Sequence, residues 1–457
     1  MSRVRLDNSQ SQPPSVIDQI EPMMQNRSAR STVQLDELEF YAEQGGAPIE
    51  QLRLDGVGAG RSIPVLADRL VNQPSFDEWA ALLRHHLGAV VEPGHDIRRL
   101  KNGGEIFPAM LSTIRSAQSS IEFLFYIFLD GEIASTFCDA LIERAEAGVH
   151  VRVLLDSVGG EALSNDLRQR LERSGVEFRI FHPISSWKIW RTTSRNHRKI
   201  LVVDSRVGYT GGVGIDDSWA EDGASLTGYR DTQFRITGPS VGLLRAAFFD
   251  SWASSGGHLP APLDSVPMAP ERSSGTLAAV IQSSSASRFA RMSLLFQFLL
   301  RCANRSVHIV TPYFVPGSCL MKEIKQARAR DVEIRLMVSG KRIDIKLPLW
   351  AGRNTYSELM RWGVTIEEYD RTLLHTKLLI VDEQIVMFGS ANMNQRSQTL
   401  DEELSVVCRD EQLARELLDD IAQDRDHCRQ IEPERWAQRS VLMRASEKFA
   451  RLFAPQL

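Results

Sequence analysis

The sequence has few cysteines, no long apolar run and no excess of basic charge. Its five cysteines among 457 residues are scattered, with no C-x-x-C pair and no Cys/His metal spacing. That pattern argues against a disulfide framework and a structural zinc, and it favours a reducing compartment. No apolar run approaches the roughly 20 residues that span a bilayer. The N-terminus has no basic head followed by an apolar segment, so we expect no signal peptide.

The net charge of -4 provides no global field for nucleic acid. What remains is an ordinary soluble composition, 43% apolar and 25% charged, in a chain long enough for two or three domains. Residues 1–60 are rich in Ser, Gln, Pro and Gly, and we expect a largely disordered extension. Residues 61–93 carry short helical patterns, and 256–276 have the composition of a linker.

Strand-like and helix-like segments alternate on both sides of this linker. The β-prone runs are 120–129, 149–155 and 176–181 before it, and 306–315, 332–338 and 363–369 after it. Alternation of this kind predicts an α/β fold in which parallel strands are joined by helical crossovers. We expect two copies of one domain, at 94–255 and 277–432, and a C-terminal amphipathic helix at 433–457.

One chemical motif, H-x-K-x4-D-x6-G, occurs in both copies. It reads His197, Lys199, Asp204 and Gly211 in the first, and His375, Lys377, Asp382 and Gly389 in the second. On a strand, a histidine and a lysine two positions apart point to the same face. Either motif alone is a weak signal, whereas two with matched flanks are a strong one. We expect the two halves to share one site at a pseudo-two-fold contact.

Each motif also predicts a hairpin, because two short apolar runs flank a polar break. With a two-residue loop in the second hairpin, His375 faces Asn392 and Lys377 faces Ser390. The same register in the first hairpin places Lys199 opposite Gly212. We therefore predict that Ser390, Asn392 and Gly212 bind phosphate.

Two histidines, two lysines, a hydroxyl and an amide suit a phosphodiester. The lysines supply positive charge without a metal, so we expect no metal and no cofactor. One neutral histidine attacks phosphorus, and the other, protonated, releases the alkoxide. The product is a covalent phosphohistidine, which a second alcohol or water resolves. The rate should then depend on pH with a bell-shaped profile, and either histidine is a candidate for the nucleophile.

Carboxylates are needed to orient the two imidazoles. We include Asp204 and Asp382 in the catalytic set, although aspartate at a hairpin loop more often has a turn role. Asp231 follows His197 and Glu403 follows His375 at equivalent places, each at the start of a strand. We predict that each of these two orients the histidine of its own half.

These residues resemble the phospholipase D superfamily, and further stretches are similar to bacterial cardiolipin synthases. The stretches are Asn102-Gly103-Gly104, Gly148–Asp156, Thr311–Pro316, Asn392 with Arg396-Ser397, and the ending 449–457. The resemblance covers nearly all of residues 94–457. Two departures are Gly214, where the first motif usually has Asn, and Asn394, where many members have Asp.

The resemblance implies a phosphatidyltransferase that needs no metal and attacks through His197. It implies phosphatidylglycerol as acceptor, with phosphatidylglycerol or phosphatidylethanolamine as donor. Because the N-terminal membrane helices of some members are absent, we expect a peripheral enzyme on the inner membrane, facing the bacterial cytoplasm. Both motifs lie in one chain, so a monomer would suffice.

Two stretches are candidates for membrane contact. Trp187 and Trp190, with neighbouring basic residues, suit a bilayer interface; a packed loop over the site is the alternative. The stretch 436–453 predicts an amphipathic helix with a basic side, suited to anionic lipid. For this helix, packing of the apolar side against the core is the alternative.

Three other functions remain open from the residues. The first is a phospholipase D that uses water and yields phosphatidic acid. The second is a nuclease, for which the charge offers no basic groove. The third is a scaffold without activity, which should have lost one of the four His and Lys residues, yet all four are present.

Overall fold

The computed structural model describes residues 76–457, except 161–162, 184–193, 221–227, 260–274 and 285–289. The expected extension 1–60, the tryptophans Trp187 and Trp190 and most of the linker 256–276 lie outside the described residues. Of the helices in the described part, none is both long and apolar enough to cross a bilayer.

The first half of the described chain runs from α4 to α9. Its strands are β1 (Val91–Lys101), β2 (Ser120–Phe125), β3 (His150–Asp156), β4 (Glu177–Phe181), β5 (Ile200–Val203), β6 (Val207–Gly211), β7 (Tyr229–Arg230) and β8 (Thr232–Thr237). Its helices are α4 (Phe76–Leu87), α5 (Asn102–Arg115), α6 (Glu132–Glu146), α7 (Ser157–Gly160), α8 (Asn165–Arg173), η3 (Asp217–Trp219) and α9 (Ser240–Ser254).

The second half repeats this plan and adds a C-terminal helical segment. Its strands are β9 (Thr276–Gln282), β10 (Ser306–Thr311), β11 (Phe314–Val315), β12 (Glu333–Ser339), β13 (Thr365–Tyr369), β14 (Leu373–Leu374), β15 (Leu378–Val381), β16 (Ile385–Gly389), β17 (Met393–Asn394), β18 (Leu404–Arg409) and β19 (Cys428–Gln430). Its helices are α10 (Arg291–Cys302), α11 (Ser318–Ala329), α12 (Lys346–Arg353), α13 (Tyr356–Arg361), α14 (Gln395–Thr399), α15 (Glu411–Arg425), α16 (Pro433–Ala437), α17 (Val441–Arg451) and η5 (Ala454–Gln456).

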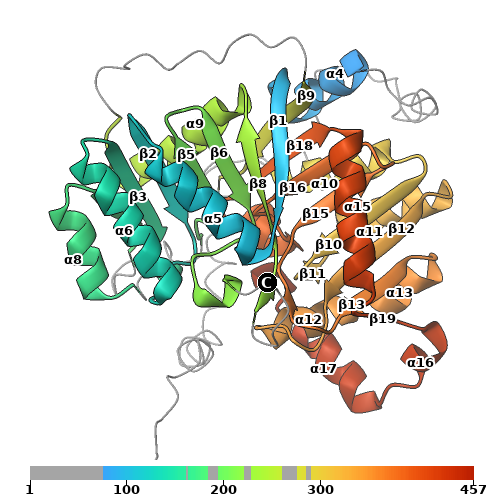
Figure 1. Ribbon diagram of the computed structural model, residues 1–457. Coiled ribbons are helices and arrows are strands. Elements are labelled where there is room, and N and C mark those ends of the chain that lie inside the picture. The colour runs from blue at the N-terminus through green and yellow to red at the C-terminus, as the bar shows by residue number, and fades with distance from the viewer. Residues whose placement is uncertain (1–75, 161–162, 184–193, 221–227, 260–274, 285–289) are drawn as a thin grey trace, which may run out of the picture. The chain divides into compact units, whose positions relative to one another are not determined.

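The two halves form one sheet with a mirrored strand order. The order is β19-β13-β12-β10-β15-β16-β18-β9-β1-β8-β6-β5-β2-β3-β4. The halves meet at the antiparallel pair β9 and β1, and helices flank the sheet (Figure 1). Strands β2, β3 and β4 pair in parallel, as do β10, β12 and β13, whereas the strands nearer the junction pair antiparallel. The edge strand β19 adds to β13 in the antiparallel sense. The expected mixed α/β architecture with two pseudo-symmetric halves is confirmed.

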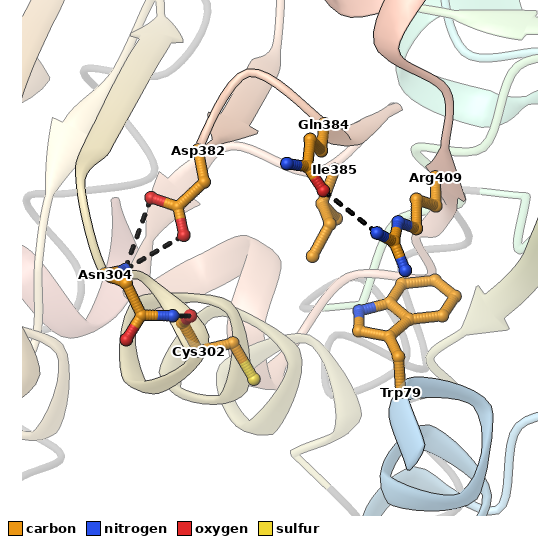
Figure 2. A pocket seen from close by; sticks show the side chains of 7 residues that line it. All are labelled: Trp79, Cys302, Asn304, Asp382, Gln384, Ile385 and Arg409. Atoms are coloured by element: carbon orange, nitrogen blue, oxygen red, sulfur yellow. Dashed lines mark hydrogen bonds between the residues drawn. The ribbon is translucent and has the colours of Figure 1, made fainter. Parts of the chain in front are cut away.

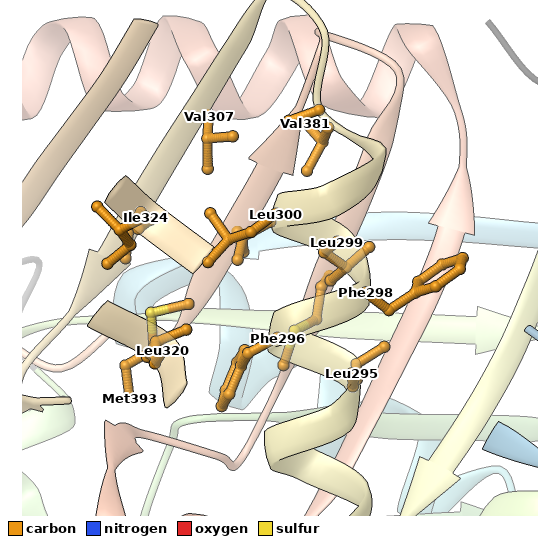
Figure 3. Close-up of a cluster of buried hydrophobic side chains, with 14 of the residues drawn as sticks. Leu295, Phe296, Phe298, Leu299, Leu300, Val307, Leu320, Ile324, Val381 and Met393 are labelled. Atoms are coloured by element: carbon orange, nitrogen blue, oxygen red, sulfur yellow. The ribbon is translucent and has the colours of Figure 1, made fainter. Parts of the chain in front are cut away.

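The central strands carry apolar residues on both faces because helices cover both faces. In β15, Leu378 and Ile380 belong to one hydrophobic cluster, while Leu379 and Val381 belong to another. This division follows the two-residue period of a strand. Figure 3 shows the cluster on one face of the second half, where α10 presents Leu295, Phe296, Leu299 and Leu300 toward the strands.

A second cluster crosses the junction between the halves. The rings of Phe234 on β8 and Phe388 on β16 stack with centroids 3.7 Å apart, and both are fully buried. Burying one such side chain contributes about 1.5–3 kcal/mol relative to leaving it exposed. Strand pairing and side-chain packing therefore both hold the halves together, which fixes the positions of residues that they contribute to a common site.

The register expected for the two hairpins is wrong by one residue. A two-residue loop requires Leu378 to pair with Gly389, but Leu378 pairs with Phe388. Likewise Ile200 pairs with Thr210. Each loop contains three residues and begins with an aspartate at positive φ, 52° at both Asp204 and Asp382. Aspartate tolerates this conformation better than most residues.

Candidate active site

The two histidines lie just before β5 and β15, where the halves contact each other. The backbone N–H of His197 donates to the carbonyl oxygen of Glu402 (2.9 Å), and that of His375 donates to Arg230 (2.8 Å). Glu402 and Arg230 directly precede the carboxylates Glu403 and Asp231. Each histidine is thus fixed by its main chain to the other half, and the site cannot form from one half alone.

The carboxylates cross between the halves. Glu403 contacts Nδ1 of His197 at 3.0 Å, and Asp231 contacts Nδ1 of His375 at 2.9 Å. The prediction that each carboxylate orients the histidine of its own half is therefore wrong. The prediction that these two histidines and two carboxylates pair with one another in one site is correct. A carboxylate at Nδ1 fixes the tautomer and leaves Nε2 for the substrate.

Each carboxylate has a second donor, and here the halves differ. The Ser390 hydroxyl donates to Glu403, whereas the Trp219 indole N–H donates to Asp231 at 3.0 Å. Ser390, expected to bind phosphate, is thus engaged in holding Glu403. Nothing in the spacing of the sequence pointed to Trp219, whose ring also lies edge-on to His375, with ring centroids 5.3 Å apart.

Gly212 occupies the position in the first half that Ser390 has in the second. A Cβ at Gly212 would lie 2.6 and 2.7 Å from the carboxylate oxygens of Asp231 and 2.9 Å from the carbonyl oxygen of His375. The missing side chain makes room for Asp231, and this is the role that the structure supports for Gly212.

Substituting Gly212 with alanine should therefore displace Asp231 and tilt His375. A misplacement of about 1 Å in such a site costs about 10²-fold in rate, and we expect a kcat loss of that order with little change in KM. Gly242→Ala on α9 is the matched control, because no atom of the described residues lies within 4 Å of its added Cβ. Equal activity of the two variants in a steady-state assay would contradict this role.

The two lysines are buried in the same site. Lys199 and Lys377 are 1% and 5% exposed, and each ammonium donates to the carbonyl of the histidine two residues before it, at 2.7 and 2.6 Å. Burial and, to a smaller extent, the nearby Lys377 ammonium lower the pKa of Lys199 to about 7. Burial lowers the pKa of Lys377 to about 8. Two buried ammonium groups near one another create a strong demand for an anion.

Both histidines are also shifted toward the neutral form. Burial lowers the pKa of His197 to about 4, with Lys199 adding to the shift and Glu403 opposing it. Burial and Lys377 lower the pKa of His375, against the effect of Asp231. These shifts favour neutral imidazoles, the form of histidine that can act as a nucleophile. A bound phosphodiester favours protonation, because its charge raises the pKa of the neighbouring bases.

Binding of an anion should consequently weaken as the pH rises from 7 to 9. Below this range the lysines already carry their protons, whereas above the pKa values of the free protein they must gain them. The Kd for sulfate should therefore rise by up to tenfold per pH unit for each lysine. Calorimetry in Tris and in HEPES would measure the accompanying proton uptake, which should fall in Lys199→Met. A Kd and enthalpy independent of pH and buffer would contradict the coupling.

Asn392 is the remaining predicted ligand. Its side chain is 5% exposed, and its amide oxygen is buried without a hydrogen-bond partner among the described residues. An unsatisfied buried amide is costly unless a ligand completes it. Asn392 stays a predicted phosphate ligand. Asn394 instead caps α14, accepting from the Ser397 N–H at 2.9 Å.

Asp204 and Asp382 do not reach the site, because the strands β5 and β15 separate them from the histidines. Figure 2 shows Asp382 accepting the Asn304 N–H, at 3.0 and 3.2 Å; Asp204 accepts the N–H groups of Gln118, Ser119 and Ser120 in the same way. The cavity beside Asp382 holds about 20 Å³, room for about one water. Both aspartates anchor hairpin loops, and the catalytic assignment has no geometric support.

A duplicated sheet with one histidine and one lysine from each half defines a phospholipase D-like protein. The family model described as "Cardiolipin synthase, PLD-like domain" matches residues 110–223 and 297–425. The chain belongs to this family of PLD-like cardiolipin synthases.

Individual proteins agree with this assignment. The chain is 30% identical to a cardiolipin synthase of Halalkalibacterium halodurans, over 92% of this chain and 81% of that protein. It is 32% identical to one of Geobacillus thermodenitrificans, over 78% and 72%, and 29% identical to one of Staphylococcus aureus, over 84% and 78%. A phosphatidylserine synthase structure from Haemophilus influenzae shares the fold, with TM-score 0.63, 15% identity and coverage of 82% and 98%.

Proposed function

We propose that this enzyme is a phosphatidyltransferase that makes cardiolipin, with phosphatidylglycerol as acceptor. The observation that carries the proposal is the pair of crossed histidine–carboxylate contacts around two buried lysines, His197 with Glu403 and His375 with Asp231, in a chain of the cardiolipin synthase family. Phosphatidylglycerol or phosphatidylethanolamine serves as the donor.

In the first step, Nε2 of one histidine attacks the phosphorus of the donor. A P–N bond forms, the P–O bond to the headgroup breaks, and the other histidine gives its proton to the departing alkoxide. We assign attack to His197, whose side chain is the more exposed of the two at 13% against 8%. His375, paired with Asp231, is then the general acid.

In the second step, the free headgroup hydroxyl of phosphatidylglycerol attacks the phosphohistidine. His375, now neutral, takes the hydroxyl proton as the P–O bond forms and the P–N bond breaks. The products are cardiolipin and the donor's headgroup alcohol, glycerol or ethanolamine. Lys199 and Lys377 stabilise the charge on the phosphoryl oxygens, a contribution of about 10²–10³ per preorganised donor, and Asn392 supplies a further contact.

Both substrates are bilayer lipids, so the enzyme works at a membrane surface. We place it peripherally on the inner membrane, on the cytoplasmic side of a bacterium, and one chain holds the whole site. Hydrolysis by water to phosphatidic acid is the competing outcome of the same intermediate.

The test is a product assay with phosphatidylglycerol vesicles. We expect cardiolipin and glycerol in equal amounts, with little phosphatidic acid and no effect of chelator. Phosphatidic acid as the main product would replace the transferase by a phospholipase D. Cleavage of DNA without a lipid product would replace it by a nuclease.

A further inference from the structure

Exposed large apolar side chains concentrate on two helices of the second half. Among the described residues, eleven such side chains are exposed; five of them lie on α17 and its C-cap and two on α12 and its N-cap. The seven are Ile345, Trp350, Val441, Leu442, Met443, Phe449 and Leu452. We call this set the α12–α17 surface. The two helices pack against each other and appear together in Figure 1.

Helix α17 turns apolar side chains away from the protein and a charged side chain toward it. Leu442, Phe449 and Leu452 are 83%, 62% and 74% exposed, whereas Glu447 is 3% exposed. Glu447 faces inward and forms an ion pair with Arg439. At about 100° per residue, Leu442, Phe449 and Leu452 lie within an arc of about 80°, and Val441 widens it to about 100°, the width that soluble helices turn toward a core. The expected alternative, core packing of the apolar side, is wrong.

The inward side of this segment is fixed by small residues. Ala450 and Ala454 pack with Val315 and Ala351, and the Arg451 guanidinium donates to the carbonyl of Pro316 at 2.6 Å. The helix is therefore held with its apolar arc facing away from the protein, and a partner can bind that arc without unfolding the segment.

Positive charge borders the apolar arc. Arg444 and Lys448 are exposed on one flank of α17, and Lys341, Arg342 and Lys346 are exposed just before or at the start of α12. Long basic side chains beside apolar ones match the boundary between acyl chains and anionic headgroups. Trp350, 39% exposed, suits the same boundary. A protein partner would need an acidic rim around an apolar groove, whereas an anionic bilayer supplies both properties.

The surface adjoins the active site. Strand β11, which follows Tyr313, pairs with β17, and β17 directly follows Asn392. The Tyr313 hydroxyl donates to Asp344 at 2.5 Å, two residues before α12, and the charge of Asp344 acts on Lys377. At the end of the chain, the Arg396 N–H donates to the carbonyl of Leu457 at 2.9 Å.

We propose that the α12–α17 surface inserts into an anionic phospholipid bilayer and thereby presents the site to its lipid substrates. The proposal deepens the proposed function and rests on it for the identity of the substrates. Docking itself requires only the apolar arc and its basic border, so it is tested independently of catalysis.

The test compares Leu442→Glu and Phe449→Glu with the wild type in vesicle co-sedimentation. The matched control is Val90→Glu. Val90 is 52% exposed and lies just before β1 in the first half, outside the α12–α17 surface. We expect each α17 variant to bind phosphatidylglycerol vesicles at least tenfold more weakly, and the control to bind as the wild type does. Binding of the wild type should weaken with salt and fall on phosphatidylcholine vesicles.

Activity separates docking from catalysis and folding. On phosphatidylglycerol dispersed in detergent, the α17 variants should stay within about twofold of the wild type, which also shows that they fold. Unchanged vesicle binding in both variants would overturn docking and leave the transferase intact. A wild type that binds vesicles but forms no cardiolipin in either assay would overturn the function instead. Loss of a dimer in light scattering, with vesicle binding unchanged, would assign the surface to a second copy.

Discussion

Replacing His197 or His375 with alanine should each reduce kcat by at least about 10⁴-fold, and the double variant should be no worse than the poorer single one. Residues that act as a unit show such non-additive losses. The contacts make the two histidines a unit, because each depends on a carboxylate from the other half. The measurement is steady-state cardiolipin formation from detergent-dispersed phosphatidylglycerol.

His150→Ala is the control, since His150 is exposed at the start of β3 and contributes nothing to the site. Its rate should match that of the wild type. Losses that multiply in the double variant would indicate two independent sites, one in each half.

Replacing Glu403 with glutamine, or Asp231 with asparagine, should lower kcat by about 10²–10⁴-fold. The amide keeps the shape but loses the charge and allows the wrong imidazole tautomer. Burial raises the pKa of Glu403, but His197 and Lys199 outweigh it and hold that pKa near 2. Glu403 is therefore charged at every pH at which activity would be measured. The control is Glu323→Gln, which changes a buried carboxylate paired with Arg301 and should leave the rate unchanged.

The crossed pairing gives these two variants different signatures. In ¹⁵N-histidine NMR, Glu403→Gln should move the ring signals of His197 and leave those of His375 nearly in place, and Asp231→Asn should do the reverse. Glu403 raises the pKa of His197, and Asp231 raises that of His375. Removing the charge of either carboxylate should therefore lower the pKa of the histidine that it contacts. If Asp231→Asn moved the ring signals of His197 instead, each carboxylate would orient the histidine of its own half, and the crossed pairing would be wrong.

The duplicated α/β architecture could be predicted because the signals for it lie in short stretches of the sequence. Alternating apolar runs and two copies of one motif were enough for β2 to β6 and β8, and for β10 to β13, β15, β16 and β18. The strands that join the halves, β1 and β9, were missed. β1 contains Pro93, Gly94 and several charged residues and has a register shift between Glu92 and His95, so no two-residue alternation is visible. β9 begins beside the Gly- and Ser-rich stretch.

The sequence predicted which residues form the site, and only the structure showed which of them contact one another. Spacing shows which residues share a strand face, but it carries no information about contacts across a pseudo-two-fold. The natural expectation, pairing within each half, therefore failed for Asp231 and Glu403. The role of Trp219 depends on η3 folding back onto Asp231, which no sequence period records. The hairpin register failed because loops of two and three residues look alike in sequence.

The α12–α17 surface shows the same limit. The amphipathic pattern of 436–453 was visible, but a period of 3.6 residues cannot say which side faces the protein. That answer depends on Glu447 being paired inward with Arg439, and on Ala450 being small enough to pack against α12.

The central claim, a covalent phosphohistidine in a site shared by the halves, is tested most directly with a phosphatidyl p-nitrophenyl ester. This leaving group needs no acid, so His375→Ala should still release one nitrophenolate per enzyme in a burst and then stall. After an alkaline quench, mass spectrometry should find the phosphatidyl group on His197, and His197→Ala should give neither burst nor adduct. A burst in His197→Ala, or cardiolipin formed by the wild type with no adduct on either histidine, would contradict the account.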